Sequence, residues 1–197
     1  MAPRSTDGPT VLTLGGDHRA MGRQHGEQAR AHRDRIHKAV QSRLGEVDGH
    51  PRNDARFRSL EQETRQALLQ HSPASAAFVR GQAEALDLEP EVLLRYALVS
   101  YLRDDLLTRA SGGSEACTTW AATGSATADG QAILAKNRDY RAEHLPLQTV
   151  SFIRPSAGYR YVSVGSAGSP VVYCAGIDGV GLAVADTHVT SRSIGPG

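Results

Sequence analysis

The 197-residue chain is poor in several features that would assign it to a class at once. It contains two cysteines and one tryptophan, and its net charge at pH 7 is +1. Two cysteines, Cys117 and Cys174, are too few for a disulfide framework, and their spacing is not that of a metal site. A net charge near zero creates no overall field that would attract nucleic acid or an anionic membrane. We therefore expect no bound metal and no nucleic-acid partner.

Long apolar runs are also missing from the sequence. No run approaches the roughly 20 residues that a membrane-spanning helix needs. The polar residues 1–10 lack the apolar core of a signal peptide. A content of 40% apolar and 22% charged residues is typical of a globular protein with one hydrophobic core. We therefore expect a cytoplasmic protein without a membrane partner.

A change of pattern near residue 112 divides the chain into two segments. Before it, apolar residues recur at helical spacing, which predicts a helical block within residues 1–116. The first helix is expected to run from Asp17, its N-cap, to about Leu44. Ser72 and Pro73 predict the N-cap and the first residue of a later helix. The helices after the first are expected at about residues 53–70, 73–87 and 90–101.

The second segment, residues 117–197, has the composition of a β-sheet. Threonine, valine, tyrosine and isoleucine dominate it, and Asp129-Gly130, Ala157-Gly158 and Asp178-Gly179 are turn signals. An antiparallel sheet is expected, with strands at 118–124, 131–137, 148–154, 159–164, 171–175 and 181–185. Residues 171–175 are apolar on both faces of a strand, so we expect further structure to cover this sheet.

The two cysteines have different sequence contexts. Cys117 follows a Gly/Ser loop and precedes a strand, which is a suitable place for a nucleophile at an exposed chain end. The alternative is that Cys117 is a small buried hydrophobic residue, as free cysteines often are. Cys174 stands among Val, Tyr and Ala, so we expect it to pack in the core.

A polar cluster follows the second predicted strand. Asn137 and Asp139 are two residues apart, so on an extended segment they point the same way, and Arg138 points the other way. A three-residue hairpin loop with Gly130 in the left-handed conformation would place Asp139 opposite Thr119, on the face of Cys117. A two-residue loop would place Asp139 on the other face. The sequence leaves both registers open.

These motifs resemble those of the acyl-coenzyme A:6-aminopenicillanic acid acyltransferase (isopenicillin N acyltransferase) family. The resemblance rests on Ala116-Cys117-Thr118-Thr119, the Asp129-Gly130 turn and Asn137-Arg138-Asp139-Tyr140. The same motifs are similar, more distantly, to those of bile-salt hydrolases and penicillin V acylases. Residues 21–26 are similar to a Gly-x-x-His-Gly stretch of the family. Residues 176–184 resemble a G-x-N-x-x-G-L-x-V hairpin, in which Asp178 replaces the Asn.

The resemblance implies an α+β fold, the four-layer αββα sandwich of autoproteolytic Ntn hydrolases. It also implies a precursor that is cut between Ala116 and Cys117, where Ala116 replaces the usual Gly. The freed Cys117 would be the nucleophile and its α-amine the general base. Asp139 matches the carboxylate that orients this amine, and Asn137 belongs to the same motif. The two cleaved chains, residues 1–116 and 117–197, would stay associated.

The implied chemistry is acyl transfer or amide hydrolysis through a thioester on Cys117. The substrate would be a small-molecule amide or acyl donor, and no cofactor is expected. A coenzyme A thioester is a co-substrate in the family that the chain resembles, but no Gly-rich phosphate loop is present here. The family's oxyanion-hole Asn and a late Arg would fall beyond Gly197. We therefore expect the sandwich to be incomplete at the C-terminus.

Two rival interpretations and the role of one histidine stay open. The chain could be a truncated or degenerate family member that acts at most as a binding domain, or a thiol enzyme that uses a histidine base near Cys117. His25, between Gly22 and Gly26, could contact substrate. We favour a structural role, in which the glycines allow close helix packing and His25 bonds a backbone group.

Overall fold

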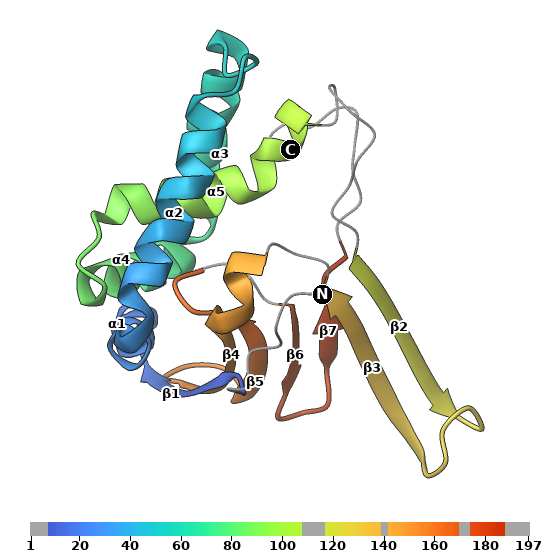
Figure 1. Cartoon of the computed structure of the whole chain (residues 1–197). Helices are drawn as coiled ribbons and strands as arrows, with labels where there is room; N and C mark the ends of the chain where they lie inside the picture. The colour runs from blue at the N-terminus through green and yellow to red at the C-terminus, as the bar shows by residue number, and fades with distance from the viewer. Residues whose placement is uncertain (1–7, 108–116, 139–141, 170–173, 188–197) are drawn as a thin grey trace.

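The computed structural model of this protein describes residues 8–107, 117–138, 142–169 and 174–187. This part of the chain is a mixed α/β protein in which a group of helices lies against one side of a mixed β-sheet (Figure 1). That composition agrees with the expected α+β class.

The helices of the first segment follow a short strand. The elements are β1 (Thr10–Gly16), α1 (His18–Gln28), α2 (Arg33–Asp48), α3 (Ala55–His71), α4 (Pro73–Ala85) and α5 (Pro90–Leu107). Asp17 caps α1 as predicted, because its Oδ1 accepts a hydrogen bond from the backbone N–H of Ala20 at 2.8 Å. Ser72 stands at the N-cap position of α4, but its hydroxyl bonds Ser75 Oγ and does not cap the helix. Among the described helices, none is both long and apolar enough to cross a bilayer.

The single helix predicted from Asp17 to Leu44 is wrong. A 3₁₀ turn at Arg30–His32 separates α1 from α2. The carboxylate of Asp87, which follows α4, bonds Arg30, the first residue of this turn, at 3.2 Å and Arg33, the first residue of α2, at 3.0 Å. A distant part of the chain thus contacts the break.

The main sheet has five described strands in the order β1-β4-β5-β6-β7. The later strands are β4 (Gln148–Pro155), β5 (Tyr161–Ser166), β6 (Ala175–Asp178) and β7 (Ala183–Ala185). The strands of residues 117–197 pair antiparallel as predicted, but the sheet as a whole is mixed, because the unpredicted strand β1 pairs with β4 in parallel. β1 belongs to residues 1–116 and β4 to residues 117–197, so the two segments share one sheet.

Two predicted strands differ from those observed. Of the strand expected at residues 171–175, residues 171–173 lie outside the described part, and β6 begins only at Ala175. The strand expected at 181–185 is shortened to Ala183–Ala185, because Asp178 forms a longer turn. Its Oδ1 accepts hydrogen bonds from the N–H groups of Val180 at 3.0 Å and Leu182 at 2.9 Å.

The two faces of the main sheet differ in an unexpected way. The face that packs against the helices carries buried hydroxyl residues on β4 and β5, namely Thr149, Ser151 and Ser163. Apolar residues on the opposite face are largely exposed, among them Phe152 at 49% and Ile177 at 51%. The face toward the helices thus combines these hydroxyl residues with the buried apolar residues Leu12, Leu14 and Ile153, and the opposite face is apolar and largely exposed.

Glycines bring α1 and α4 into close contact. A Cβ atom at Gly22 would lie 1.9 Å from the carbonyl oxygen of Phe78, and one at Gly81 would lie 2.1 Å from that of Arg19. Real Cβ atoms do not approach backbone atoms so closely, so these positions need glycine. The predicted role of glycine near His25 in close helix packing is confirmed.

Strands β2 (Cys117–Gly124) and β3 (Gly130–Arg138) form a separate antiparallel hairpin beside β7 (Figure 1). Neither predicted loop length is found, because residues 125–129 form a five-residue connection and the register shifts between Ala122 and Gly124. Gly130 does adopt the left-handed conformation, with φ of 73°. This longer loop sets the register on which the candidate site depends.

Candidate functional site

Cys117 is the first residue of β2, and its side chain is half-buried. It lies at the open end of the hairpin, where its backbone partner is Arg138, the last residue of β3. Ala116, the other residue of the predicted cleavage bond, lies outside the described residues, as does Asp139. The structure therefore places the predicted nucleophile at the start of a strand and leaves its two predicted neighbours undescribed.

The observed register decides the facing of the polar cluster, which the sequence left open. Residues directly opposite each other in an antiparallel pair share a face. Arg138 pairs with Cys117 and Asn137 pairs with Thr118, so Arg138 is on the face of Cys117 and Asn137 is on the other. Asn137 is exposed. Arg138 and Asn137 point to opposite faces, as predicted. Arg138 shares the face of Cys117, as it would with the two-residue loop, although the observed connection has five residues.

The hairpin face that carries Cys117 lies against the end of β7. Lys136 and Thr119, which pair with each other on this face, both contact the residues that follow β7. The ammonium of Lys136 bonds the carboxylate and the carbonyl of Asp186, and only 4% of the Lys136 side chain is exposed. Thr119 Oγ1 bonds Thr187 Oγ1. These contacts fix the position of the Cys117 strand relative to the main sheet.

Arg138 joins the hairpin to the centre of the main sheet. Its Nη1 donates a hydrogen bond to Ser166 Oγ, at the end of β5, at 3.1 Å. Arg138 also interacts with the thiol of Cys174, which is buried at 8% exposure as predicted. Burial raises the pKa of that thiol above its ordinary value, and the positive charges of Arg138 and Lys136 oppose the shift. The sequence predicted no role for Arg138 in the site.

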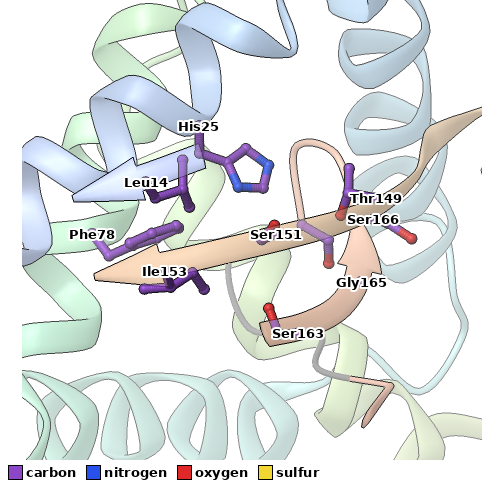
Figure 2. Close-up of a pocket in the computed structure, with 10 residues that line it drawn as sticks. Leu14, His25, Phe78, Thr149, Ser151, Ile153, Ser163, Gly165 and Ser166 are labelled. Carbon is purple, nitrogen blue, oxygen red and sulfur yellow. The ribbon is translucent and has the colours of Figure 1, made fainter. Parts of the chain in front are cut away.

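A pocket lies between the helices and the polar face of the sheet. Figure 2 shows the imidazole of His25 extending from α1 toward β4. The pocket has a volume of about 30 Å³. Its polar lining consists of His25, Thr149, Ser151, Ser163, Ser166 and Ser169, and Leu14, Phe78 and Ile153 contribute apolar surface.

His25 is buried and uncharged in this pocket. It is 5% exposed, and its ring meets that of Phe78 edge to face with centroids 5.8 Å apart. Burial lowers the pKa of His25 to about 4, so the imidazole is neutral at pH 7. Its Nε2 is buried and has no hydrogen-bond partner among the described residues. The predicted bond from His25 to a backbone group is therefore wrong.

The described residues contain neither a hydrogen-bonded cysteine–histidine pair at Cys117 nor a group of metal ligands. No hydrogen bond among them joins Cys117 to a histidine, and no group of three His, Cys, Asp or Glu residues in this part could hold a metal ion. Comparison with known proteins adds no assignment, since no protein-family model and no curated protein matches the chain.

Proposed function

We propose that this protein is an autoproteolytic cysteine-nucleophile acyltransferase or amide hydrolase that acts through a thioester on Cys117. The observation that carries the proposal is the position of Cys117 as the first residue of β2, half-buried at the open end of a hairpin. A nucleophile that becomes a chain end must stand at the start of an element, so that cleavage leaves the element intact. The motif resemblance supports the same assignment.

The maturation step uses only groups of the chain and water. The Cys117 thiol attacks the carbonyl carbon of Ala116, and the peptide nitrogen leaves as the α-amine of Cys117. Water then hydrolyses the resulting thioester, which gives the carboxylate of Ala116 and restores the thiol. Pairing between β1 and β4 would keep the two products together, because these strands come from opposite sides of the cut.

In the turnover step, the α-amine of Cys117 takes the proton of its thiol, and the sulfur attacks the substrate carbonyl. The leaving amine receives that proton, and water or a second amine takes the acyl group from the thioester. In this step Asp139 orients the α-amine of Cys117. Its neighbour Arg138 ends β3 opposite Cys117. We keep Asn137 in the proposed site because it belongs to the Asn-x-Asp motif, although its position on β3 faces away from Cys117.

We further propose that the exposed apolar face of the main sheet is the inner face of an αββα sandwich. Val150, Phe152, Val162, Val164 and Ile177 lie together on this face through the strand register. Contiguous apolar patches of this kind are rare on soluble monomers unless another layer covers them. A second β-layer would cover this patch, and in the family that the chain resembles that layer comes from residues beyond the position of Gly197.

Intact mass under denaturing conditions tests the proposal. The wild-type chain and a C-terminally longer version should each be measured, together with Cys117→Ala and, as a matched control, Cys174→Ala. We expect two fragments, the second beginning with Cys117, from the wild type and from Cys174→Ala. Cys117→Ala should stay whole.

Two results would reject or restrict the proposal. If neither the chain nor its longer version is cut, the autoproteolytic assignment is wrong. If only the longer version is cut, cleavage needs residues beyond Gly197, and the shorter chain is a non-catalytic domain, as the rival interpretation holds.

A further inference from the structure

Arg138 connects the position of the proposed nucleophile to the interior of the main sheet. It is half-buried at the end of β3, and its partner across the hairpin is Cys117, on the same face. Residues directly opposite each other in an antiparallel pair have Cβ atoms about 4.5–5.5 Å apart. The side chain of Arg138 therefore leaves the hairpin next to that of Cys117.

The guanidinium of Arg138 reaches two buried groups of the main sheet. Its Nη1 donates a hydrogen bond to Ser166 Oγ at 3.1 Å, and it also interacts with the thiol of Cys174. Ser166 is the last residue of β5 and Cys174 directly precedes β6, and both residues are buried. A planar guanidinium can contact two groups at once, whereas the ammonium of lysine is a point charge on a flexible stem. Arginine is therefore suited to this bridging position.

The hairpin of β2 and β3 depends on such bridges, because it forms a two-stranded sheet of its own beside β7 (Figure 1). Isolated two-stranded hairpins are only marginally stable in water. Lys136 joins the hairpin to Asp186, which follows β7, the last strand in the described order. Arg138 joins it to β5, which is central in that order, and does so from the pair that contains Cys117.

Cleavage before Cys117 would make this bridge more important. Cys117 and Arg138 form the outermost pair of the described ladder, and after the cut Cys117 would also be a chain end. Chain ends are poorly ordered unless a contact holds them. A misplacement of about 1 Å in a reacting group can cost roughly a hundredfold in rate. The contacts of Arg138 act at the pair where fraying of the hairpin would begin.

We propose that Arg138 is the positioning residue of Cys117. It holds the outermost pair of the hairpin on β5 through Ser166, and it thereby keeps the sulfur of Cys117 in place for the reaction with substrate. This role rests on the proposed function of Cys117, whereas the anchoring itself can be measured without activity. Cleavage should depend less on Arg138, because the thiol and the carbonyl of Ala116 are adjacent in the chain.

Hydrogen exchange of backbone amides, resolved by NMR, tests the anchor whether or not the chain is cut. We expect Arg138→Gln to speed exchange of the protected amides among residues 118–120 about tenfold, and to leave the amides of α4 unchanged. Arg138→Lys should show an intermediate rate, because an ammonium can bond Ser166 without spanning both groups. Arg154→Gln is the matched control, since Arg154 is exposed on β4, and it should keep the wild-type rates.

Steady-state kinetics of a version that is cut and active separate positioning from a merely structural role. We expect Arg138→Gln to lower kcat about tenfold or more while KM changes less than about twofold, and Arg138→Lys to recover part of the loss. Ser166→Ala should also lower kcat. The double variant Arg138→Gln/Ser166→Ala should be no slower than Arg138→Gln alone, because both substitutions remove the same contact.

Three results would overturn the role of Arg138. Wild-type exchange of residues 118–120 in Arg138→Gln would show that Arg138 does not anchor the hairpin, and a wild-type kcat would show that it does not position Cys117. Additive losses in the double variant would show that Arg138 does not act through Ser166. If Arg138→Gln fails to fold, Ser166→Ala replaces it in the exchange measurement. A wild type that is neither cut nor active contradicts the proposed function, and the exchange rates then decide the anchor by themselves.

Discussion

The two thiols of the chain lie in different surroundings. Cys174 is 8% exposed, and burial raises its pKa, so it is seldom present as the reactive thiolate. Cys117 is half-buried at the end of a strand. We expect iodoacetamide at pH 8 to alkylate Cys117 about tenfold faster than Cys174. Peptide mass spectrometry over time measures both rates in one sample, and equal or reversed rates would contradict these roles.

Asp139 has a proposed role that a charge-removing substitution can isolate. Asp139→Asn keeps the shape and one acceptor oxygen but cannot stabilise the ammonium that forms when the thiol proton moves. We expect the variant to fold, to be cleaved and to turn over a chromogenic amide roughly ten- to a thousandfold more slowly. The assay needs a version of the chain that is cut and active.

Asp129→Asn provides the control for Asp139→Asn. Asp129 Oδ1 accepts a hydrogen bond from the Gln131 N–H at 3.0 Å in the hairpin loop, and an amide oxygen can accept the same bond. This control should keep wild-type turnover. Full activity in Asp139→Asn would remove Asp139 from the site, and loss of cleavage would place it in maturation.

His25 makes the stability of the fold depend on pH. Its pKa is lowered from 6.5 to about 4 in the folded protein by burial, so the unfolded chain binds the proton more tightly. The contribution of neutral His25 to the free energy of unfolding is therefore fully present above pH 6.5 and is lost as the pH falls toward 4. A shift of this size corresponds to a loss of about 3 kcal/mol.

Urea unfolding at several pH values between 7 and 4 measures this effect. The wild type should lose more stability across this range than His25→Phe, which has no proton to gain, and the difference between the two curves isolates His25 from the carboxylates. Parallel curves for the two proteins would show that His25 is not buried as a neutral group.

At the scale of elements, the contact of α1 with α4 depends on glycine. Alanine at Gly22 or Gly81 would place a Cβ within 1.9 Å or 2.1 Å of a backbone carbonyl oxygen, so the helices would have to separate. We expect either substitution to lower the free energy of unfolding by about 1–3 kcal/mol.

Gly45→Ala in α2 is the control for these two substitutions. Its Cβ meets nothing within 4 Å, and helix propensity should raise stability by up to about 1 kcal/mol. Urea denaturation measures all three, and equal effects at Gly45 and Gly22 would contradict this packing.

The sequence predicted most helices and strands because their signals are local. Asp17 as an N-cap, Pro73 at the start of a helix and Asp178 in a turn act within a few residues. The break between α1 and α2 has no such signal. The contact found there is with Asp87, which is distant in sequence and bonds Arg30 and Arg33.

The hairpin register could not be predicted from the sequence for a related reason. The Asp129-Gly130 pair marks a turn, but it does not determine how many residues before it belong to the loop. A five-residue loop and a register shift near Ala122 place Arg138, and not Asn137, on the face of Cys117. A change of one residue in register exchanges the two faces of a strand. The sequence therefore left open whether Arg138, the middle residue of the Asn-x-Asp motif, shares the face of Cys117.

At the scale of the whole molecule, alternation along a strand does not say which face is covered. In β4 and β5, hydroxyl residues alternate with apolar ones, and the usual interpretation would turn the hydroxyls toward water. The structure turns them toward α1, where the His25 pocket lies, and described apolar residues of the opposite face, such as Phe152, are largely exposed. The pocket residues on β4 and β5 could not be found from the sequence, because the alternation fits both orientations.

The neighbours Phe152 and Ile153 on β4 test this orientation. Phe152 is 49% exposed on the apolar face, and Ile153 is 5% exposed on the face that packs against α1. Ile153→Thr buries a hydroxyl and leaves a cavity, so we expect a loss of about 2 kcal/mol or more in the free energy of unfolding. Phe152→Thr should cost less than about 1 kcal/mol in this chain, since surface changes have small effects. It should also reduce binding of the dye ANS to the exposed patch.

In a C-terminally longer version whose second layer covers this face, Phe152→Thr should cost about 3 kcal/mol, the value for a buried aromatic residue. Equal costs for the two substitutions in the present chain would mean that both faces of the sheet are already covered, and a small cost in the longer version would mean that no second layer packs there.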